Sequence, residues 1–169
     1  MKNKTTVGRT WVRLAVKALI IAVILWISFG VCLGLRRVSS ITMNGRINDG
    51  DFVLFDRMKN TYNAGDVVFY THDGKELLSE IIGVEDDLIL VDDEGFLLVN
   101  GEVITDAPVY DFTLGETNPF SNGFRVPAGT YFVLNSNYEI TNDSRSFGAI
   151  NAKDIKGSII ALMLRTRGF

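Results

Sequence analysis

Residues 87–104 read DLILVDDEGFLLVNGEVI, and they indicate the fold class more directly than any other stretch. Three short apolar runs are separated by Asp-Asp-Glu-Gly and by Asn100-Gly101. An Asn-Gly pair between two strand-like runs is a strong hairpin signal, because both residues tolerate the positive φ angles of a tight turn. The stretch therefore predicts two successive β-hairpins, the second turning at Asn100-Gly101.

The same alternation of short apolar runs and turn residues continues on both sides of this stretch. Gly-Asp and Asp-Gly pairs punctuate it, and no helical periodicity follows the N-terminal region. Several runs are apolar on both faces, which is typical of strands buried on both sides. The further strand-like runs are 51–56, 66–70, 77–84, 129–135 and 157–164, with an irregular loop expected over 109–124. These runs predict an all-β domain with a folded-over or barrel-like sheet.

The N-terminal region carries a separate signal. Ala18–Leu35 are eighteen residues without a charge, about the minimum for a helix crossing a ~30 Å hydrocarbon core. A cleavable signal peptide is the alternative, and it is disfavoured because the run exceeds a usual signal-peptide core and lacks a clean small-x-small site. We therefore expect a cytoplasmic N-terminus (1–17), a transmembrane anchor (18–35) and an extracytoplasmic β domain (38–169).

The distribution of charge sets the expected orientation and partners. The first 37 residues hold 7 of the 17 lysines and arginines and none of the 20 acidic residues, which leaves 10 basic against 20 acidic residues and a net charge of −10 beyond them. Five basic residues precede the span and two follow it, so the positive-inside rule places the N-terminus in the cytoplasm of a single-pass protein. A domain this acidic is a poor ligand for nucleic acid, and we expect protein partners.

Few residues in the chain could support metal or hydrolytic chemistry. Cys32, the single cysteine, lies in the span, and the single histidine, His72, lies in a turn-like segment, so we expect no metal and no cofactor. A Ser-His-Asp arrangement is excluded for the same reason. A Ser-Lys mechanism needs a lysine buried among strands, whereas Lys75 lies in an Asp-Gly-Lys-Glu turn. From the residues alone, the case for a hydrolase is poor.

Four ordered motifs nevertheless resemble those of a known family. They are TMNGRINDGDFVLF (42–55), GDVVFY (65–70), SEIIGVEDD (79–87) followed by VNG (99–101), and VPAGTYFVLNSNYEITNDSRSFG (126–148). In this order they resemble the boxes of type I signal peptidases, which are membrane-anchored Ser-Lys endopeptidases that remove signal peptides. The resemblance implies the signal-peptidase fold for the β domain.

The departures from that pattern fall on the catalytic positions. In the resemblance the nucleophilic serine corresponds to Thr42, and the general-base lysine corresponds to Ser79. The arginine after the base becomes Glu80, the auxiliary serine that hydrogen-bonds the base becomes Thr141, and the glycine of the family's last Gly-Asp pair becomes Asn135. Both members of the catalytic dyad are therefore replaced.

The scaffold positions of the same motifs are kept. They include Met43, Asn137, Asp143 and Arg145, of which Asp143 and Arg145 are expected to pair as a local structural clamp. A serine hydroxyl at position 79 is not basic near neutral pH, and loss of a general base typically costs ~10²–10⁴-fold in rate. The pattern predicts a cleft that is retained and a chemistry that is lost.

The resemblance is strongest to the catalytically degenerate signal-peptidase-like proteins of Gram-positive pilus assembly. It implies a peptide-binding chaperone or scaffold for sortase-dependent pilin polymerisation, with extended polypeptides or pilins as substrates and a sortase as a further candidate partner. The alternative is an active signal peptidase with Thr42 as nucleophile and an unidentified base. A third reading is an envelope protein with an unrelated structural task.

Overall fold

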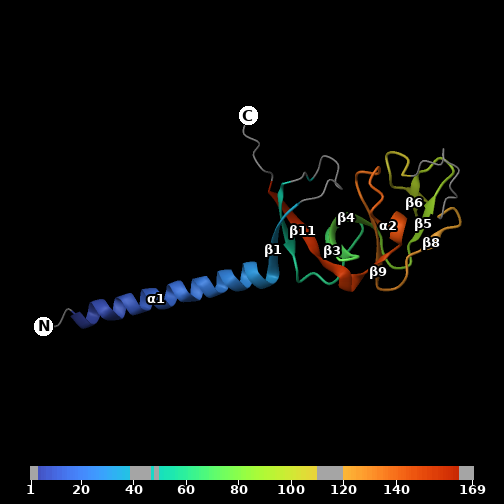
Figure 1. The fold of residues 1–169 in the computed structure, drawn as a ribbon. Helices are drawn as coiled ribbons and strands as arrows, with labels where there is room; N and C mark the ends of the chain where they lie inside the picture. Colours follow the sequence, from blue (N-terminus) through green and yellow to red (C-terminus); the bar gives the residue numbers. More distant parts are fainter. Residues whose placement is uncertain (1–3, 39–46, 48–49, 110–119, 164–169) are drawn as a thin grey trace, which may run out of the picture.

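A computed structural model of the protein describes residues 4–38, 47, 50–109 and 120–163. A long N-terminal helix leads directly into a β domain made of two sheets, as Figure 1 shows. The seven-stranded sheet lies beside the end of the helix, and the four-stranded sheet lies at the far end of the domain. The prediction of a mostly β domain behind one apolar helix is confirmed.

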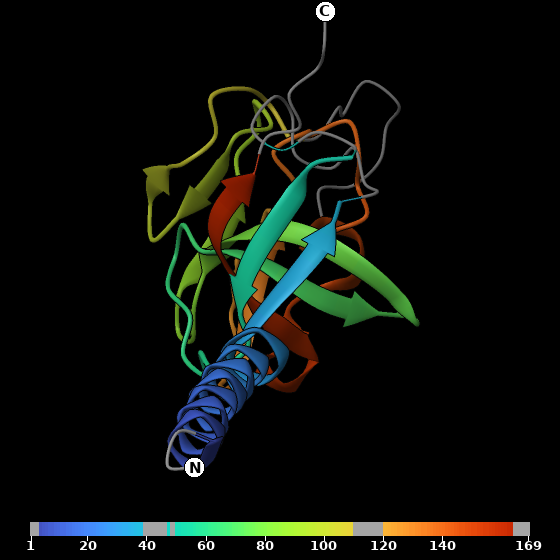
Figure 2. The same ribbon diagram turned by 90° about the vertical axis from the view of Figure 1, so that its left-hand side faces the viewer.

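The N-terminal helix α1 spans Lys4–Ile27 and continues through a π-helical turn, Ser28–Cys32, into strand β1, Leu33–Arg37. The part Trp11–Cys32 is apolar and long enough to cross a membrane, since its 22 residues extend about 33 Å at 1.5 Å each. Residues 33–35, expected at the end of the span, lie in β1. Figure 2 shows the helix running into this strand without an intervening loop.

The larger sheet is antiparallel, with the order β1-β2-β11-β3-β4-β9-β10. The strand β11 inserts between β2 and β3, so residues 155–163 pair with strands from the first part of the β domain. A four-residue helix and a 3₁₀ turn connect its outer strands. The bounds are β2 Phe52–Asp56, β3 Val67–His72, β4 Lys75–Gly83, β9 Thr130–Leu134, α2 Ser144–Phe147, β10 Ile150–Asn151, η3 Ala152–Asp154 and β11 Ile155–Met163.

The smaller sheet contains both predicted hairpins. Its order is β7-β6-β5-β8, with bounds Leu88–Val91 for β5, Leu97–Val99 for β6, Glu102–Val103 for β7 and Phe124–Arg125 for β8. Asn100 and Gly101 have φ angles of 53° and 88°, as a tight two-residue turn requires. The hairpin turning at this pair is therefore confirmed.

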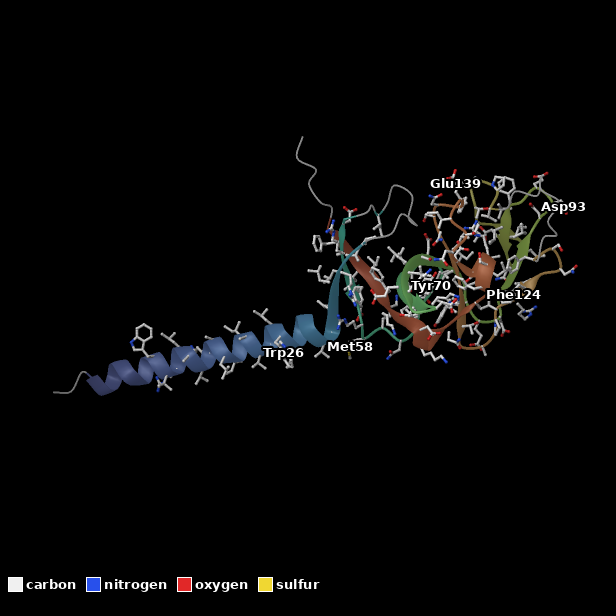
Figure 3. The ribbon with its side chains drawn as sticks, viewed as in Figure 1. Trp26, Met58, Tyr70, Asp93, Phe124 and Glu139 are labelled. Atoms are coloured by element: carbon white, nitrogen blue, oxygen red, sulfur yellow. The ribbon has the colours of Figure 1, made fainter. Side chains whose placement is uncertain are left out.

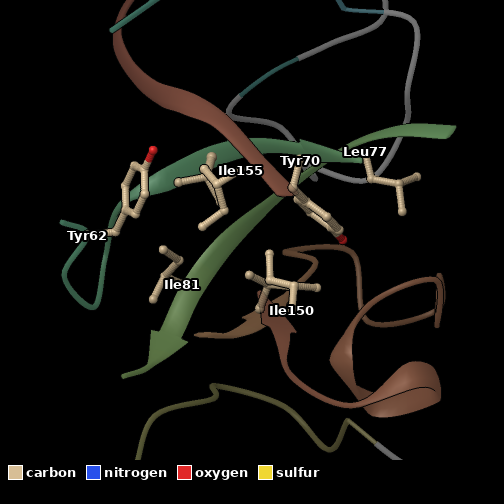
Figure 4. Packing of buried hydrophobic residues seen from close by; sticks show 8 residues of the cluster. Tyr62, Tyr70, Leu77, Ile81, Ile150 and Ile155 are labelled. Carbon is tan, nitrogen blue, oxygen red and sulfur yellow. The ribbon is translucent and has the colours of Figure 1, made fainter. Parts of the chain in front are cut away.

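Among the residues that the structure describes, three apolar clusters form the core. The strand β4 separates two of them, because Leu77 and Ile81 face the cluster around Tyr70 while Leu78 faces the cluster around Val53. Figure 4 shows the first cluster from close by. The third lies between β9 and the smaller sheet. Burial of β4 on both faces confirms the expectation drawn from its apolar pattern.

The two sheets of the β domain are open in the part of the chain that the structure describes. Within the described residues, the larger sheet ends at β1 and β10 and the smaller one at β7 and β8, so neither closes on itself. The strands at these ends have two to five residues. The third cluster lies between the two sheets, so they share a core.

Candidate functional site: a buried hydroxyl network at the lysine position

Ser79 lies in the middle of β4 and is fully buried, with 0% of its surface exposed. Its Oγ is 2.7 Å from Asn135 Oδ1 and 3.1 Å from the Tyr70 hydroxyl. The register pairs Ser79 with Val68, which places Tyr70 one diagonal step away on the same face of the sheet. Ser79, which corresponds to the general base in the resemblance, therefore lies inside the core.

The direction of these hydrogen bonds follows from the donors available. Asn135 Nδ2 donates to the Ile140 carbonyl at 2.9 Å, so its Oδ1 faces Ser79. Ser79 has one hydroxyl proton, which it donates to this oxygen, and Tyr70 must then donate to Ser79. The chain of donation runs from Tyr70 through Ser79 and Asn135 to a backbone carbonyl. No buried side-chain polar atom among the described residues lacks a partner, so the network is satisfied.

Tyr70 is held in its neutral form by its surroundings. Burial is the largest cause that raises the pKa of Tyr70 well above its usual value; the hydrogen bond to Ser79 opposes this, and the charge of Asp143 adds to it. A neutral phenol donates a hydrogen bond and takes up no proton near neutral pH. Tyr70 therefore supplies a fixed donor and cannot replace an amine base.

Asp143 and Arg145 form the predicted clamp. Their side chains are fully buried, and Arg145 Nη2 and Nε lie 2.8 and 2.9 Å from the two carboxylate oxygens of Asp143. The guanidinium also donates to the carbonyls of Val109, Tyr138 and Ile140 at 2.7–2.8 Å. This pair therefore fixes the turn-rich segment that follows β9 against the neighbouring loop.

The clamp also supports the hydroxyl network. Asp143 Oδ2 accepts a hydrogen bond from the Asn135 backbone N–H at 2.9 Å, and Asp143 caps α2 by accepting from the Arg145 backbone N–H. Ser144 Oγ accepts from the Val133 N–H in β9 at 2.9 Å. These bonds position Asn135 at the end of β9, opposite Ser79.

The other two predicted residues of this segment lie outside the network. Thr141 is exposed, and its backbone carbonyl accepts hydrogen bonds from the Asp143 N–H and the Ser146 hydroxyl. Asn137 Oδ1 accepts from the Glu139 N–H at 3.2 Å and shapes a turn. The structure therefore brings together Ser79, Asn135 and Tyr70, where the resemblance had implied Ser79 and Thr141.

An open cavity of about 890 Å³ lies directly beside this network. Glu80, the residue after Ser79, and Ser136, the residue after Asn135, both contribute to its wall. The rest of the wall is formed by the polar residues Asp106, Asn137, Tyr138 and Glu139 and by the apolar residues Ile104, Ala107 and Pro108. A cavity of this size and polarity, at the edge of the smaller sheet, can accept part of an extended polypeptide.

Thr42, the nucleophile position in the resemblance, and Met43 lie outside the described residues. The described residues on either side of them are Val38 and Ile47. Both pack in one cluster with Leu78, the residue before Ser79. The described residues that flank Thr42 in sequence, Val38 and Ile47, therefore lie beside β4, the strand that carries Ser79.

The remaining candidate bases lie far from Ser79. Lys75 is exposed at the start of β4, as predicted, and pairs with His72 across the β3–β4 hairpin. His72 ends β3 and stacks on Phe147, with ring centroids 3.8 Å apart. Lys75 is four strand residues from Ser79, roughly 13 Å, and His72 lies at the same end of the hairpin. Among the described residues, no cluster of His, Cys, Asp or Glu could hold a metal ion.

Sequence reasoning missed Tyr70 and Asn135 as partners of Ser79. Asn135 was noted only as a departure from glycine, and its contact with Ser79 spans 56 residues of sequence. Tyr70 had no local signal, because its pairing depends on the register of β3 against β4. An apolar strand interrupted by one small hydroxyl residue, as in Leu-Leu-Ser-Glu-Ile-Ile, was the available hint that Ser79 needed a buried partner.

Comparison with known proteins identifies relatives over most of the chain. Residues 9–164 match the family described as signal peptidase, peptidase S26. The protein "Signal peptidase I V" of Bacillus subtilis (strain 168) is 29% identical over 140 residues, covering 73% of this chain and 81% of its own length. "Inactive signal peptidase IA" of Staphylococcus aureus (strain Mu50) is 28% identical over 149 residues, covering 83% of this chain and 84% of its own.

A solved structure is also similar. The crystal structure of a signal peptidase I from Enterococcus faecalis V583 is 19% identical and covers 58% of this chain and 96% of its own, with a TM-score of 0.44. The relation of the chain to other proteins rests on the sequence match over residues 9–164.

Proposed function

The chain belongs to the signal peptidase family, peptidase S26, and on that premise we propose that it is a membrane-anchored member without Ser-Lys chemistry. In this proposal it acts as a peptide-binding chaperone or scaffold for sortase-dependent pilin polymerisation at the cell surface. The N-terminal helix is the anchor, the N-terminus is cytoplasmic, and the β domain is extracellular. An N-terminal apolar helix long enough to serve as an anchor supports this arrangement.

The observation that carries the proposal is the environment of Ser79. A general base must accept a proton, and the Ser79 oxygen already accepts from Tyr70 while its proton is donated to Asn135. The hydroxyl is buried, not basic, and fully hydrogen-bonded. Without a base, the hydroxyl of Thr42 stays a weak nucleophile, and the loss of a general base costs about 10²–10⁴-fold in rate.

Names of relatives do not decide between an active and an inactive protein. The relative named signal peptidase I V and the one named inactive signal peptidase IA are 29% and 28% identical to this chain. The residue at position 79 favours the inactive reading, because the lysine of β4, Lys75, is exposed at the start of the strand, four residues from Ser79. The alternative, an active signal peptidase with Thr42 as nucleophile, requires a base from elsewhere.

Retention of the scaffold supports a binding role. The clamp of Asp143 and Arg145 holds the segment that lines the 890 Å³ cavity, and the exposed strand β7 forms an open edge of the smaller sheet beside that cavity. Open sheet edges bind extended peptides through backbone hydrogen bonds, and neighbouring cavities accept alternate side chains. The pilin and sortase assignment itself rests on the resemblance to degenerate members of pilus assembly.

Deletion and complementation in the host organism test the proposal. Deletion is expected to abolish pilus polymers while other preproteins are secreted and processed normally. Complementation with Thr42→Ala is expected to restore the polymers fully, because the proposed role needs no nucleophile. A general secretion defect on deletion would contradict the assembly role, and failure of Thr42→Ala alone to complement would favour the active peptidase.

A further inference from the structure

A second cavity, distinct from the candidate site, lies at the end of the domain nearest α1. It has a volume of about 320 Å³. Two phenyl rings, Phe55 and Phe69, form an apolar part of its wall with their centroids 5.4 Å apart. The charged part of the wall is formed by Arg36, Arg57, Glu76 and Lys156. This cavity therefore combines an aromatic surface with three cations and one carboxylate.

Backbone and side-chain contacts fix this cavity against the end of the apolar helix. The Arg57 backbone N–H donates to the Cys32 carbonyl at 3.0 Å, and its guanidinium donates to the Gly30 carbonyl at 3.3 Å. Gly30 and Cys32 are the last residues of the apolar segment Trp11–Cys32. Figure 3 shows Met58, the next residue after Arg57, beside the end of the helix. If α1 crosses a bilayer, the cavity lies where the helix leaves the hydrocarbon.

The end of the β domain nearest α1 is positively charged, whereas the β domain as a whole is negatively charged. Residues beyond position 37 carry a net charge of −10, yet cations outnumber carboxylates in this cavity. A neighbouring cavity shares Arg57 and adds Lys59 and Lys153. The acidic residues Glu80, Asp106 and Glu139 line the cavity beside the candidate site. Figure 3 shows Glu139 far from α1.

The side chains in the cavity are arranged for an anion. Arg57 lies over the Phe55 ring, 5.5 Å from its centroid, and this contact together with the Gly30 carbonyl fixes the guanidinium. Arg36 pairs with Glu76 at the rim, at 3.1 Å, where both side chains are half exposed. Lys156 is exposed, and its ammonium group completes the charged wall. Guanidinium and ammonium groups together are the usual ligands of a phosphate.

We propose that this cavity binds the phosphate headgroup of an anionic phospholipid from the bilayer that α1 crosses. Arg57 and Lys156 bind the phosphate, and the partly exposed ring of Phe69 contacts the glycerol and first acyl carbons. Phe55, 3% exposed, supports that ring from within the core. The inference rests on the proposed anchoring of α1. Binding at this point fixes the height and tilt of the β domain above the membrane, and so holds the 890 Å³ cavity toward chains that emerge from it.

The test measures lipid retention by the full-length protein. The protein is reconstituted in nanodiscs of phosphatidylcholine alone or of a three-to-one mixture with phosphatidylglycerol, released, and examined by native mass spectrometry. Wild type is expected to retain one phosphatidylglycerol in preference to phosphatidylcholine. The double variant R57Q/K156Q is expected to bind phosphatidylglycerol roughly 25-fold more weakly, since each basic residue near an anionic surface contributes about a five-fold factor.

The matched control removes two cations from elsewhere on the β domain. K75Q/R125Q changes the net charge equally at exposed positions outside the cavity and is expected to retain lipid as wild type does. Equal retention by R57Q/K156Q, or equal loss in the control, would overturn the proposal. If soluble glycerol phosphate at the same concentration as the lipid displaces the bound phosphatidylglycerol, the cavity binds free phosphate esters and the proposal of a lipid site is wrong. Alkaline carbonate extraction reports separately whether α1 is inserted, so a failed anchor is distinguishable from a failed lipid site.

Discussion

Replacing Arg145 with methionine is expected to destabilise the β domain strongly. The substitution removes the guanidinium while the Asp143 carboxylate stays fully buried, with the backbone N–H groups of Asn135 and Arg145 as its remaining donors. The carbonyls of Val109 and Tyr138 also lose their hydrogen-bond donor. A buried charge without a counter-charge is then the main cost.

The expected magnitude follows from the burial of the pair. Both side chains are 0% exposed, and removing one partner of a buried ion pair costs about 3–5 kcal/mol. For a domain of this size about 2–4 °C of melting temperature is lost per kcal/mol, so a fall of roughly 6–20 °C is expected. Adding Asp143→Asn removes the unpaired charge, and about 1 kcal/mol or more of the loss is expected to return.

Differential scanning calorimetry of the full-length protein in detergent measures the melting temperature of each variant. Tryptophan fluorescence is unsuitable, because Trp11 and Trp26 both lie in α1 and do not report on the β domain. The control Lys75→Met removes an exposed cation and is expected to change stability by less than about 0.5 kcal/mol. A loss below about 1 kcal/mol for Arg145→Met, or strict additivity with Asp143→Asn, would refute the view that the pair is a buried structural clamp.

Three further predictions concern the network and the start of the sheet. Ser79→Lys alone is expected to destabilise the protein by about 1–3 kcal/mol, because a longer side chain must enter a filled core. Adding Asn135→Gly should recover part of this lost stability in urea titrations. No recovery would show that Asn135 does not fill the space of the lysine side chain. Tyr70→Phe should lose about 1 kcal/mol at neutral pH. Because the pKa of Tyr70 is higher in the folded than in the unfolded state, the neutral phenol stabilises the fold below about pH 10, and this stabilisation is lost as the pH rises further. The stability of Tyr70→Phe should therefore fall less steeply than that of wild type between about pH 9 and 12. An unchanged slope would contradict the assignment. Gly34→Ala should cost about 1–3 kcal/mol in thermal melts, because its Cβ would lie 2.1 Å from the Phe55 ring; a neutral result would show that β1 is not packed on that ring.

Local chemistry made much of the fold predictable. The Asn100-Gly101 turn and the strand-length apolar runs were read correctly because each depends on neighbouring residues alone. The start of β1 was missed because Leu33–Leu35 continue the apolar run of the helix, and no residue type marks the change from helix to strand. The order of the strands and the open edges of the two sheets could not be read from the sequence, because they depend on which strands pair.

In the candidate site, too, contacts between residues close in sequence could be predicted, and contacts between distant residues could not. Asp143 and Arg145 are two residues apart, so their pairing could be predicted from sequence spacing. Asn135 reaches Ser79 only through the register of β4 against β9, with a shift between Ile81 and Gly83. A register of this kind is set by packing across the sheet, and it decides which side chains share a face.

The central claim, that the scaffold was kept while the Ser-Lys chemistry was lost, is tested most directly by a peptidase assay. The purified full-length protein in detergent is incubated with a fluorogenic signal-peptide substrate, beside Thr42→Ala and beside the triple variant Thr42→Ser, Ser79→Lys, Asn135→Gly. The account predicts that wild type and Thr42→Ala are equally inactive and that cleavage appears only in the triple variant. Cleavage by wild type that disappears in Thr42→Ala would contradict it.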